Sequence, residues 1–501
     1  MKANAIQPFF LLPLLIAVPA LTPASWAAAQ TLNIVHTFAA IPPGPAPSTN
    51  YDGAYPLAGL VLSGNTLYGT AERGGTNNSD GNGTVFAVSL NGSNFTTLHN
   101  FSANGSGHPA NSDGALPFGG LVLSGGTLYG TTASGGTNGQ GTVFAINING
   151  SNFMVLHHFQ PTYEGTNGDG TLPEAGLVLS GNTLYGTATG GGTNGNGTVF
   201  AVNTNGSNFT VLHTFKALVS NTNSDGAVPL AGLIIAGSTL YGTAEEGGTN
   251  GNGTVFAVNT NGLNFTTLHH FAGYPGEGSF PLAGLVLSGD TLYGTTSEGG
   301  TNINESGTIF AINTNGANFA TLHNFNGTPG DGAQPVAGLF LSGSTLYGTT
   351  QAGGTNGYGT IFAVSTSGTG FTNLYVFSAT AFSAFSSTNS DGTEPSAGLI
   401  LAGNTLYGTA QDGGTNGFGT VFGLALGPVS ASPPKLAITP AGTYVILNWP
   451  TNAAGFTLES ATNLAPPVVW TTNATAPVVV STNNVVTNAI TGNRKFYRLS
   501  Q

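Results

Sequence analysis

Seven acidic side chains recur at one position of an internal repeat and could bind a cation. Each stands directly before a glycine and four residues ahead of a proline, and the set is Asp52, Asp113, Asp169, Asp225, Glu277, Asp331 and Asp391. Five have an asparagine two positions earlier, as Asn50 precedes Asp52. Oxygen ligands at this spacing suit Ca²⁺, but an Asx-type turn needs the same residues, and sevenfold recurrence favours the turn. We expect these acids to contribute to ligand binding, with Ca²⁺ as the cofactor to test.

Two other carboxylates break the repeat and could act as catalytic acids. Glu174 follows the repeated proline and Glu394 precedes it, where most repeats have apolar residues. Partial burial among negative charges raises a carboxyl pKa, as a general acid requires. Glycoside hydrolysis also needs two carboxyl groups about 5–10 Å apart across the bond. The alternative is an exposed strand end that tolerates polar residues, as Gln334 and Ser396 suggest.

Histidine also recurs, two residues before a phenylalanine. The set is His36, His99, His157, His213, His269 and His323, with Tyr375 in the seventh place. Metal ligation needs several imidazoles to converge, and one per repeat on an outer strand cannot do so. We expect these side chains to pack and form hydrogen bonds between repeats.

The N-terminus predicts export from the cytoplasm. Lys2 precedes an apolar run at 9–21, and three alanines at 27–29 offer a cleavage site before Gln30. The run is short and contains prolines, and no later segment approaches the roughly 20 apolar residues of a membrane span. We expect residues 1–29 to be a signal peptide and the mature protein to be a secreted or cell-surface monomer without a membrane span.

Composition narrows the possible partners and chemistry. The chain has no cysteine, which excludes disulfides and thiol catalysis. Residues 30–428 contain 18 carboxylates and only two basic residues, Arg73 and Lys216, a net charge of −16. Because phosphate binding needs the opposite sign, nucleic acid is excluded as an expected partner.

The motif Leu-Tyr-Gly-Thr marks seven tandem units. It begins at Leu67, Leu128, Leu184, Leu240, Leu292, Leu346 and Leu406. One unit reads as four strands, for example at 229–235, 239–243, 253–259 and 264–271, separated by glycine and asparagine turns. Four short antiparallel strands per repeat are typical of a propeller blade. The fold class predicted for 30–426 is therefore an all-β, seven-bladed β-propeller.

The ends of the repeat array predict how the ring closes. Residues 31–38 resemble a fourth strand that precedes the first unit, and the last unit stops after its third strand at 419–426. The N-terminal strand can therefore complete the last blade, whereas an open β-helix or adhesin stalk, the alternative, has no use for it. Small pairs such as Ala58-Gly59 place the first strand innermost, where backbones converge.

Loop positions predict an acidic face. Connections between strands two and three, and those leading into strand one, emerge on the same side of a blade. They contain 17 of the 18 propeller carboxylates, and only Asp290 falls in a hairpin turn. The repeated Gly-Gly-Thr-Asn segment in these connections supplies turn geometry, because no lysine or following helix accompanies it as in a phosphate-binding loop.

The motifs Leu-Tyr-Gly-Thr, Gly-Gly-Thr-Asn-Gly and Gly-Thr-Val-Phe resemble the Gloeo/Verruco (GloVer) tandem repeat of secreted bacterial proteins, over about residues 50–426. The repeat is also kelch-like in its double glycine and tyrosine. The resemblance implies no activity. Many family members carry a hydrophobic C-terminal anchor, and the residues Arg498-Leu499-Ser500-Gln501 depart from that pattern, so we do not expect one here.

A second region follows a linker at 427–434. Residues 435–501 carry a net charge of +3, and alternating segments at 444–449, 456–460 and 478–480 predict a small β-sandwich of the Ig or fibronectin III type. Trp449 and Trp470 are expected in its core rather than on a sugar-binding platform. The region is similar to a C-terminal module of verrucomicrobial secreted proteins.

The leading functional hypothesis is a non-catalytic binding or surface-interaction propeller whose acidic face engages an extracellular glycan or protein. A nearly uniform sevenfold face supports it, since catalysis needs a few groups in distinct environments. The alternatives are a glycoside hydrolase or polysaccharide lyase that uses Glu174 and Glu394, and a purely structural cell-surface protein.

Overall fold

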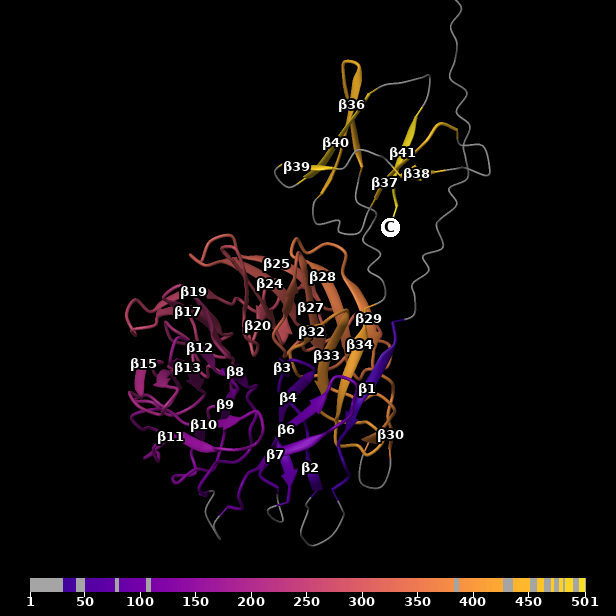
Figure 1. Cartoon of the computed structure of the whole chain (residues 1–501). Coiled ribbons are helices and arrows are strands. Elements are labelled where there is room, and N and C mark those ends of the chain that lie inside the picture. The colour runs from indigo at the N-terminus through magenta and orange to yellow at the C-terminus, as the bar shows by residue number, and fades with distance from the viewer. Residues whose placement is uncertain are drawn as a thin grey trace, which may run out of the picture. The chain divides into compact units, whose positions relative to one another are not determined.

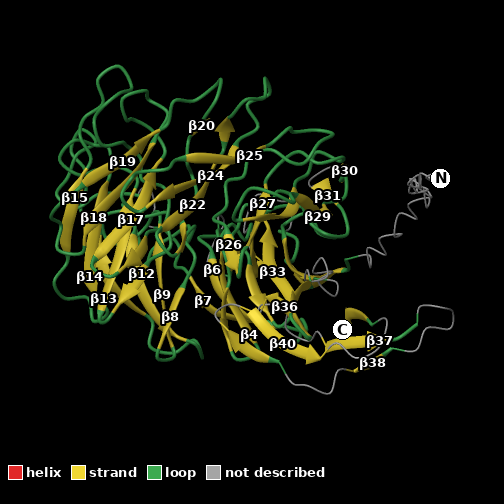
Figure 2. Ribbon diagram, turned by 90° about the horizontal axis from the view of Figure 1, so that it is seen from above, coloured by secondary structure: helices red, strands yellow, loops and turns green. Residues whose placement is uncertain are grey.

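The computed structural model describes residues 30–41, 50–76, 81–104, 110–382, 387–426, 436–450, 457–463, 470–472, 477–480, 483–489 and 495–500. Within these ranges the protein consists of strands and loops, and no helix is present that could cross a membrane (Figure 2). The chain divides into two compact units, with residues 30–426 in one and the residues after 426 in the other. The predicted signal peptide and linker lie outside the described residues.

The described part of 30–426 contains seven four-stranded antiparallel sheets, numbered here in chain order. Sheet 1 consists of β3 (Val61–Ser63), β4 (Thr66–Ala71), β6 (Thr84–Ser89) and β7 (Thr96–Asn100). Sheet 2 consists of β8 (Val122–Ser124), β9 (Thr127–Thr132), β10 (Thr142–Asn147) and β11 (Met154–His158). Sheet 3 consists of β12 (Val178–Ser180), β13 (Thr183–Ala188), β14 (Thr198–Asn203) and β15 (Thr210–Thr214). Sheet 4 consists of β16 (Ile234–Ala236), β17 (Thr239–Ala244), β18 (Thr254–Asn259) and β19 (Thr266–His270).

The remaining three sheets repeat the pattern. Sheet 5 consists of β21 (Val286–Ser288), β22 (Thr291–Thr296), β24 (Thr308–Asn313) and β25 (Ala320–Asn324). Sheet 6 consists of β26 (Phe340–Ser342), β27 (Thr345–Thr350), β28 (Thr360–Ser365) and β29 (Thr372–Val376). Sheet 7 consists of β32 (Ile400–Ala402), β33 (Thr405–Ala410), β34 (Thr420–Ala425) and β1 (Leu32–Thr37). Figure 1 shows these sheets arranged around a centre, with β8 and β12 facing it and β11 and β15 on the outside.

The Leu-Tyr-Gly-Thr motif joins each sheet to the next. In sheet 1, Leu67 is fully buried, and a Cβ on Gly69 would lie 2.6 Å from Cζ of Phe86, so only glycine fits there. The Thr70 hydroxyl donates a hydrogen bond to the carbonyl oxygen of Gly119, on the inner segment of the next repeat. All seven threonines make the equivalent bond: Thr70, Thr131, Thr187, Thr243, Thr295, Thr349 and Thr409.

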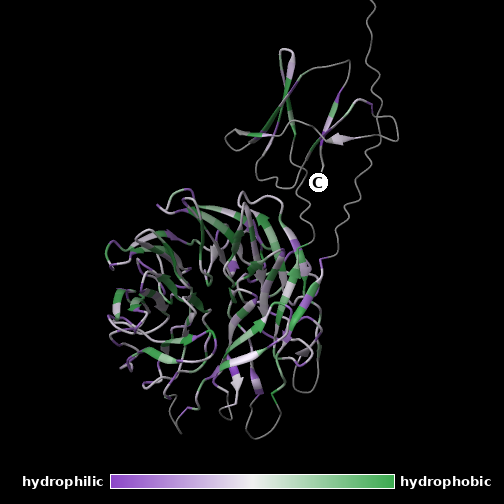
Figure 3. Ribbon diagram, viewed as in Figure 1, coloured by the Kyte–Doolittle hydropathy of each residue, from purple (hydrophilic) through white to green (hydrophobic). Residues whose placement is uncertain are grey.

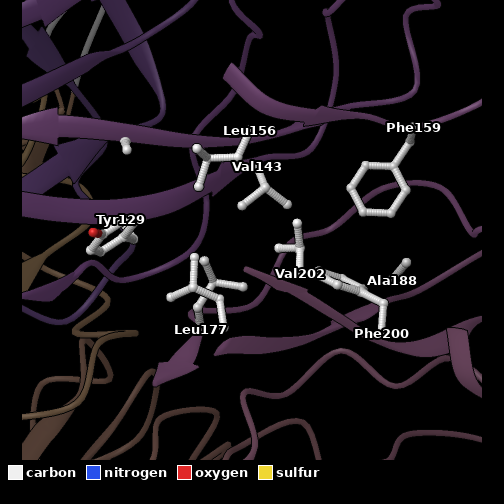
Figure 4. Close-up of a cluster of buried hydrophobic side chains, with 10 residues drawn as sticks. Tyr129, Val143, Leu156, Phe159, Leu177, Ala188, Phe200 and Val202 are labelled. Atoms are coloured by element: carbon white, nitrogen blue, oxygen red, sulfur yellow. The ribbon is translucent and has the colours of Figure 1, made fainter. Parts of the chain in front are cut away.

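Hydrophobic side chains fill the space between neighbouring sheets. Between sheets 2 and 3, Tyr129 and Val143 pack with Leu177 and Phe200 (Figure 4). Fully burying one such aliphatic or aromatic side chain stabilises the fold by about 1.5–3 kcal/mol. Figure 3 shows the hydrophobic residues along the strands and hydrophilic residues in many connecting loops. The core is therefore divided into similar layers, one for each pair of sheets.

The N-terminal strand completes the last sheet, as predicted. β1 pairs antiparallel with β34, with Leu32 opposite Leu424 and Thr37 opposite Thr420. Asn416 donates a side-chain hydrogen bond of 2.8 Å to the carbonyl oxygen of Phe38. The pairing leaves no exposed edge on β34, which removes a site for strand addition.

The innermost segments approach one another at glycine. A Cβ on Gly176 would lie 3.0 Å from the carbonyl oxygen of Gly120, and one on Gly59 would lie 3.3 Å from that of Gly398. The same relationship links Gly59, Gly120, Gly176, Gly232, Gly284, Gly338 and Gly398 into a continuous series. Small residues therefore lie where the innermost segments converge, as expected, although in the structure they precede the first strand of each sheet.

The predicted first strand was too long. In sheet 4 the pattern indicated residues 229–235, but β16 covers only Ile234–Ala236. Val228 has a positive φ of 56°, and Leu230 donates its backbone N–H to Val228, which turns the chain away from the ladder. The carbonyl oxygen of Ala231 accepts a hydrogen bond from the hydroxyl group of Thr187 in the previous sheet, not from a neighbouring strand of sheet 4.

The second unit contains two sheets in its described residues. The first consists of β35 (Ala437–Ala441), β36 (Tyr444–Pro450), β40 (Asn483–Ala489) and β39 (Val478–Val480). The second consists of β38 (Thr471–Thr472), β37 (Thr457–Ala461) and β41 (Phe496–Ser500). Leu447, Trp449 and Val486 of the first sheet cluster with Leu458 of the second. Trp449 is 2% exposed, as expected for the core, whereas Trp470 is partly exposed and lies under Arg498.

Candidate functional site

The seven recurrent acids are all held by hydrogen bonds within the fold. The imidazole Nε2 of His157, at the end of sheet 2, lies 2.8 Å from a carboxylate oxygen of Asp169. The backbone N–H of Gln160 donates to the same carboxylate. Equivalent pairs, at 2.6–3.0 Å, are His36–Asp52, His99–Asp113, His213–Asp225, His269–Glu277, His323–Asp331 and Tyr375–Asp391. Each acid therefore links the fourth strand of one sheet to the connection that begins the next.

The preceding asparagines, rather than the acids, form the turns. The side-chain oxygen of Asn167 accepts hydrogen bonds from the backbone N–H groups of Gly170 and Gly192. Its amide donates to the carbonyl oxygens of Gln160 and Gly170. Asn50, Asn111, Asn223 and Asn389 make the same kind of network. The acid is thus free to pair with histidine, or with Tyr375 in one repeat, a partnership that sequence reasoning missed although both sets of residues were recognised as recurrent.

The recurrent histidines pack between sheets, as expected. His213 stacks on Phe265 of the next sheet, with ring centroids 3.6 Å apart and planes within 9°. It also meets the edge of Phe215 at 5.0 Å. In the described part of the chain, no three His, Asp or Glu side chains gather in a way that could hold a metal ion. Ca²⁺ binding at the recurrent acids stays a prediction.

The two carboxylates that break the repeat lie in separate groups. Burial raises the pKa of Glu174, and the negative charge of Glu245 raises it further. Burial also raises the pKa of Glu245, with additional effects from Glu246 and Glu298. The charge acting on Glu174 therefore comes from sheet 4, and Glu245 in turn links this group to Glu298 of sheet 5.

Glu394 belongs to the other group, where sheet 7 meets sheet 1. Burial, followed by the charges of Glu394 and Glu72, raises the pKa of Asp412 to about 6. Glu72 itself is buried, which raises its pKa, and the neighbouring Arg73 partly offsets this shift through a 3.0 Å ion pair. Asp412 was not singled out from the sequence, because only its neighbours in space set its pKa apart from that of other loop acids.

Seven non-glycine residues with a left-handed backbone form a further set that the sequence did not reveal. Each precedes the repeated proline with φ between 55° and 57°: Tyr55, Leu116, Leu172, Val228, Phe280, Gln334 and Glu394. Such a conformation costs about 1–3 kcal/mol for an ordinary residue. Backbone hydrogen bonds to distant residues hold it, since Val228 donates to Asn196 of the preceding repeat and accepts from Glu245 of its own. Two repeats have leucine at this position, and the other five each have a different residue. The same backbone conformation therefore presents side chains of different chemical character.

The two kinds of connection that carry most acids lie side by side. β2 (Asn50–Ala54) pairs with β5 (Arg73–Gly75), and β20 (Gly278–Ser279) pairs with β23 (Glu298–Gly299). In the other repeats an isolated β-bridge takes the place of this two-stranded sheet, for example between Ala227 and Glu246. A short hairpin of β30 (Ala381–Phe382) and β31 (Ser387–Thr388) lies in the connection before sheet 7. The connection into each first strand is thus bound to the second-to-third connection of its own sheet.

Solved structures similar to this chain are distant from it. One is a candidate 6-phosphogluconolactonase from Bacteroides fragilis, 15% identical, with a TM-score of 0.42, where the match covers 83% of this chain and 94% of the other. An oligogalacturonate lyase in complex with manganese is 12% identical, with a TM-score of 0.44 and coverage of 80% and 97%. A chain of a nidogen/laminin complex is 15% identical, with a TM-score of 0.35 and coverage of 57% and 87%. No curated protein matches the chain.

The comparison with sequence families gives a clearer result than the comparison with solved structures. The Gloeobacter/Verrucomicrobia repeat matches residues 30–233, 162–331 and 214–384. These matches overlap and together extend from the N-terminal strand β1 into the connection that precedes sheet 7. The chain belongs to the Gloeobacter/Verrucomicrobia repeat family.

Proposed function

We propose that this protein is a secreted, seven-bladed β-propeller with a C-terminal β-sandwich, and that it binds an extracellular glycan or protein without catalysis. The seven sheets correspond to the blades. The series of threonine hydrogen bonds supports the blade count, because Thr409 of the last sheet returns to Ala58 of the first repeat. The hydrophobic cluster shared by the two C-terminal sheets supports the sandwich.

The binding surface proposed is the loop face, defined as the connections into each first strand together with those between second and third strands. Apart from the seven acids paired with histidine or tyrosine, nine described carboxylates lie in these connections: Glu72, Glu164, Glu174, Glu245, Glu246, Glu298, Glu305, Glu394 and Asp412. Arg73 and Lys216 are the basic residues of this unit. Such a face repels polyanions and favours neutral or cationic ligands.

Exposed apolar side chains on the same loops provide contact area. Tyr51 is 84% exposed, Tyr163 78% and Ile303 82%. Tyrosine offers a rigid apolar ring with a polar end, which suits both sugar and protein ligands. The observation that carries the proposal is this concentration of variable, exposed and acidic residues on one edge of an otherwise uniform repeat.

A carbohydrate-active enzyme is the second candidate, and one observation favours it. Asp412 has a pKa of about 6, within the range at which a carboxyl group can donate a proton near neutral pH. However, Glu174 and Glu394, the pair required by the enzyme hypothesis, interact with different groups of carboxylates. A role as an inert surface protein is the third candidate, and the absence of any ligand would support it.

The test is binding of the mature chain to a glycan array and to a panel of extracellular proteins, with and without about 1 mM Ca²⁺. Tyr163→Ala and the double variant Glu245→Gln/Glu246→Gln should weaken binding to the ligand found. Asp290→Asn is the matched control, because it removes a carboxylate from the hairpin turn between β21 and β22. Binding that the control weakens as much as the loop variants do would place the site elsewhere.

A further inference from the structure

A pocket of about 750 Å³ opens on the loop face between sheets 5 and 6. Its lining includes Glu298, Asn304, Glu305, Ser306, Thr328 and Gln334. Ligand sites for small molecules usually have volumes of about 300–1,000 Å³. The pocket is therefore large enough for one or more sugar units and much larger than a single amino-acid side chain requires.

The pocket lies beside a departure from the repeat. The connection at 301–307 of sheet 5 is two residues longer than the corresponding 249–253 of sheet 4. In sheet 4, Asn250 donates its side-chain amide to the carbonyl oxygen of Phe271. Asn302, at the equivalent place, instead donates to the side-chain oxygen of Asn326. The longer connection thus follows a different course and presents Ile303, Asn304 and Glu305 to the pocket.

Hydrogen bonds fix the other walls. The backbone N–H of Gln334 donates to the carbonyl oxygen of Ser306 at 3.0 Å, and Ala333 donates to Ala352 at 2.8 Å. Gly327 donates to Gly332 at 2.8 Å across the base of the adjoining loop. A preformed wall lowers the cost of ordering the site when a ligand binds.

The charge of the pocket is uncompensated. Glu298 and Glu305 are both exposed, and the sequence from 217 to 434 contains no lysine or arginine. Asn304, Ser306 and Gln334 supply amide and hydroxyl groups that can bond sugar hydroxyls. Ile303, which is 82% exposed, offers an apolar contact at the rim.

We propose that this pocket binds a saccharide that carries a free amino group, such as a glucosamine oligomer. The carboxylates of Glu298 and Glu305 bind the ammonium group, and the amide and hydroxyl groups bind the sugar hydroxyls. The inference deepens the proposed binding function and rests on it, because it names the ligand class and the place on the loop face.

The experiment compares two trisaccharides of equal length, the glucosamine trimer and its N-acetylated counterpart, by calorimetric titration of the mature chain. Acetylation replaces each ammonium group with an uncharged acetamide group, and the glutamate variants separate the loss of charge from the added bulk. We expect the glucosamine trimer to bind more tightly, by about fivefold or more for an ammonium group between two carboxylates, and its affinity to fall when salt is raised to about 0.5 M.

Variants locate the site. Glu298→Gln and Glu305→Gln should each weaken glucosamine binding about threefold to fivefold and leave the acetylated trimer unaffected, whereas Asp290→Asn should change neither. Replacing residues 301–307 with the five residues of 249–253 should abolish the preference. Equal affinity for the two trimers, or a preference that survives the Glu298→Gln/Glu305→Gln double variant, overturns the inference. If another glycan then bound elsewhere on the loop face, the proposed binding function would still hold and only the assignment of this pocket would fail.

Discussion

The hydroxyl group of Thr409 donates a 3.1 Å hydrogen bond to the carbonyl oxygen of Ala58, a residue 351 positions earlier in the chain. It makes the same contact that each Leu-Tyr-Gly-Thr threonine makes with the next repeat. Together with the pairing of β1 and β34, it joins the last sheet to the first. A ring closed at two independent points should lose stability when either is removed.

Removal of residues 30–38 should therefore destabilise the first unit. The deletion exposes the edge of β34 and takes away Phe38, which is fully buried. Loss of one buried phenylalanine alone costs about 3–5 kcal/mol. We expect a lower melting temperature and concentration-dependent aggregation, measured by calorimetry and light scattering. A truncated protein that melts like the intact chain and stays monomeric would contradict closure by β1.

The glycine of Leu-Tyr-Gly-Thr should be intolerant of even one methyl group. In Gly69→Ala the new Cβ would lie 2.6 Å from Cζ of Phe86 and 2.8 Å from Cδ2 of Leu60. Overpacking of this kind costs about 1–3 kcal/mol, which chemical denaturation would measure. The control is Gly168→Ala, whose Cβ would meet only the end of the flexible Gln160 side chain. Equal stability of the two variants would show that the close packing at Gly69 has no energetic role.

The hydrogen bonds to Asp331 should make stability depend on pH. Burial tends to raise the pKa of Asp331, but hydrogen bonds from His323 and from the backbone N–H of Asn326 outweigh it, so the net pKa lies below its usual value. The stabilising effect is then complete above the ordinary aspartate pKa of about 3.9 and is lost as the pH falls through the lower folded value. Urea unfolding between about pH 2 and 5 should show a steeper loss of stability on acidification for the native chain than for Asp331→Asn. Identical pH profiles would show that the pair does not stabilise the fold.

Asp412 should have the opposite effect. Its pKa is raised to about 6, so the folded state prefers the protonated form. Any stabilisation from that proton is complete below the ordinary aspartate pKa and is lost as the pH rises through the folded value near 6. Asp412→Asn should therefore raise the melting temperature at pH 8 relative to the native chain and change it little at pH 4. The control is Asp290→Asn, on an exposed turn, which should leave the melting temperature unchanged at both pH values. If Asp412→Asn also leaves both melting temperatures unchanged, the pKa of Asp412 is not raised.

The sequence predicted the repeat, the strand order within it and the N-terminal closing strand, because each depends on local patterns that recur seven times. It did not predict the left-handed backbone at Val228, since a β-branched residue there is unfavourable by itself and is held by bonds to residues distant in the sequence, Asn196 and Glu245. The pairing of His157 with Asp169 was missed for a similar reason. It spans two sheets, and the separation of such pairs along the chain varies with loop length.

The central claim, binding without turnover on the loop face, is tested most directly by following one ligand through both processes. The glycan that binds best on the array is incubated with the mature chain, and its length and reducing ends are measured after binding has reached equilibrium. We predict that the ligand is recovered intact and that Tyr163→Ala and Glu245→Gln/Glu246→Gln weaken its binding while Asp290→Asn does not. Release of shortened or unsaturated products that disappears in Glu174→Gln, Glu394→Gln or Asp412→Asn would contradict the claim and establish an enzyme.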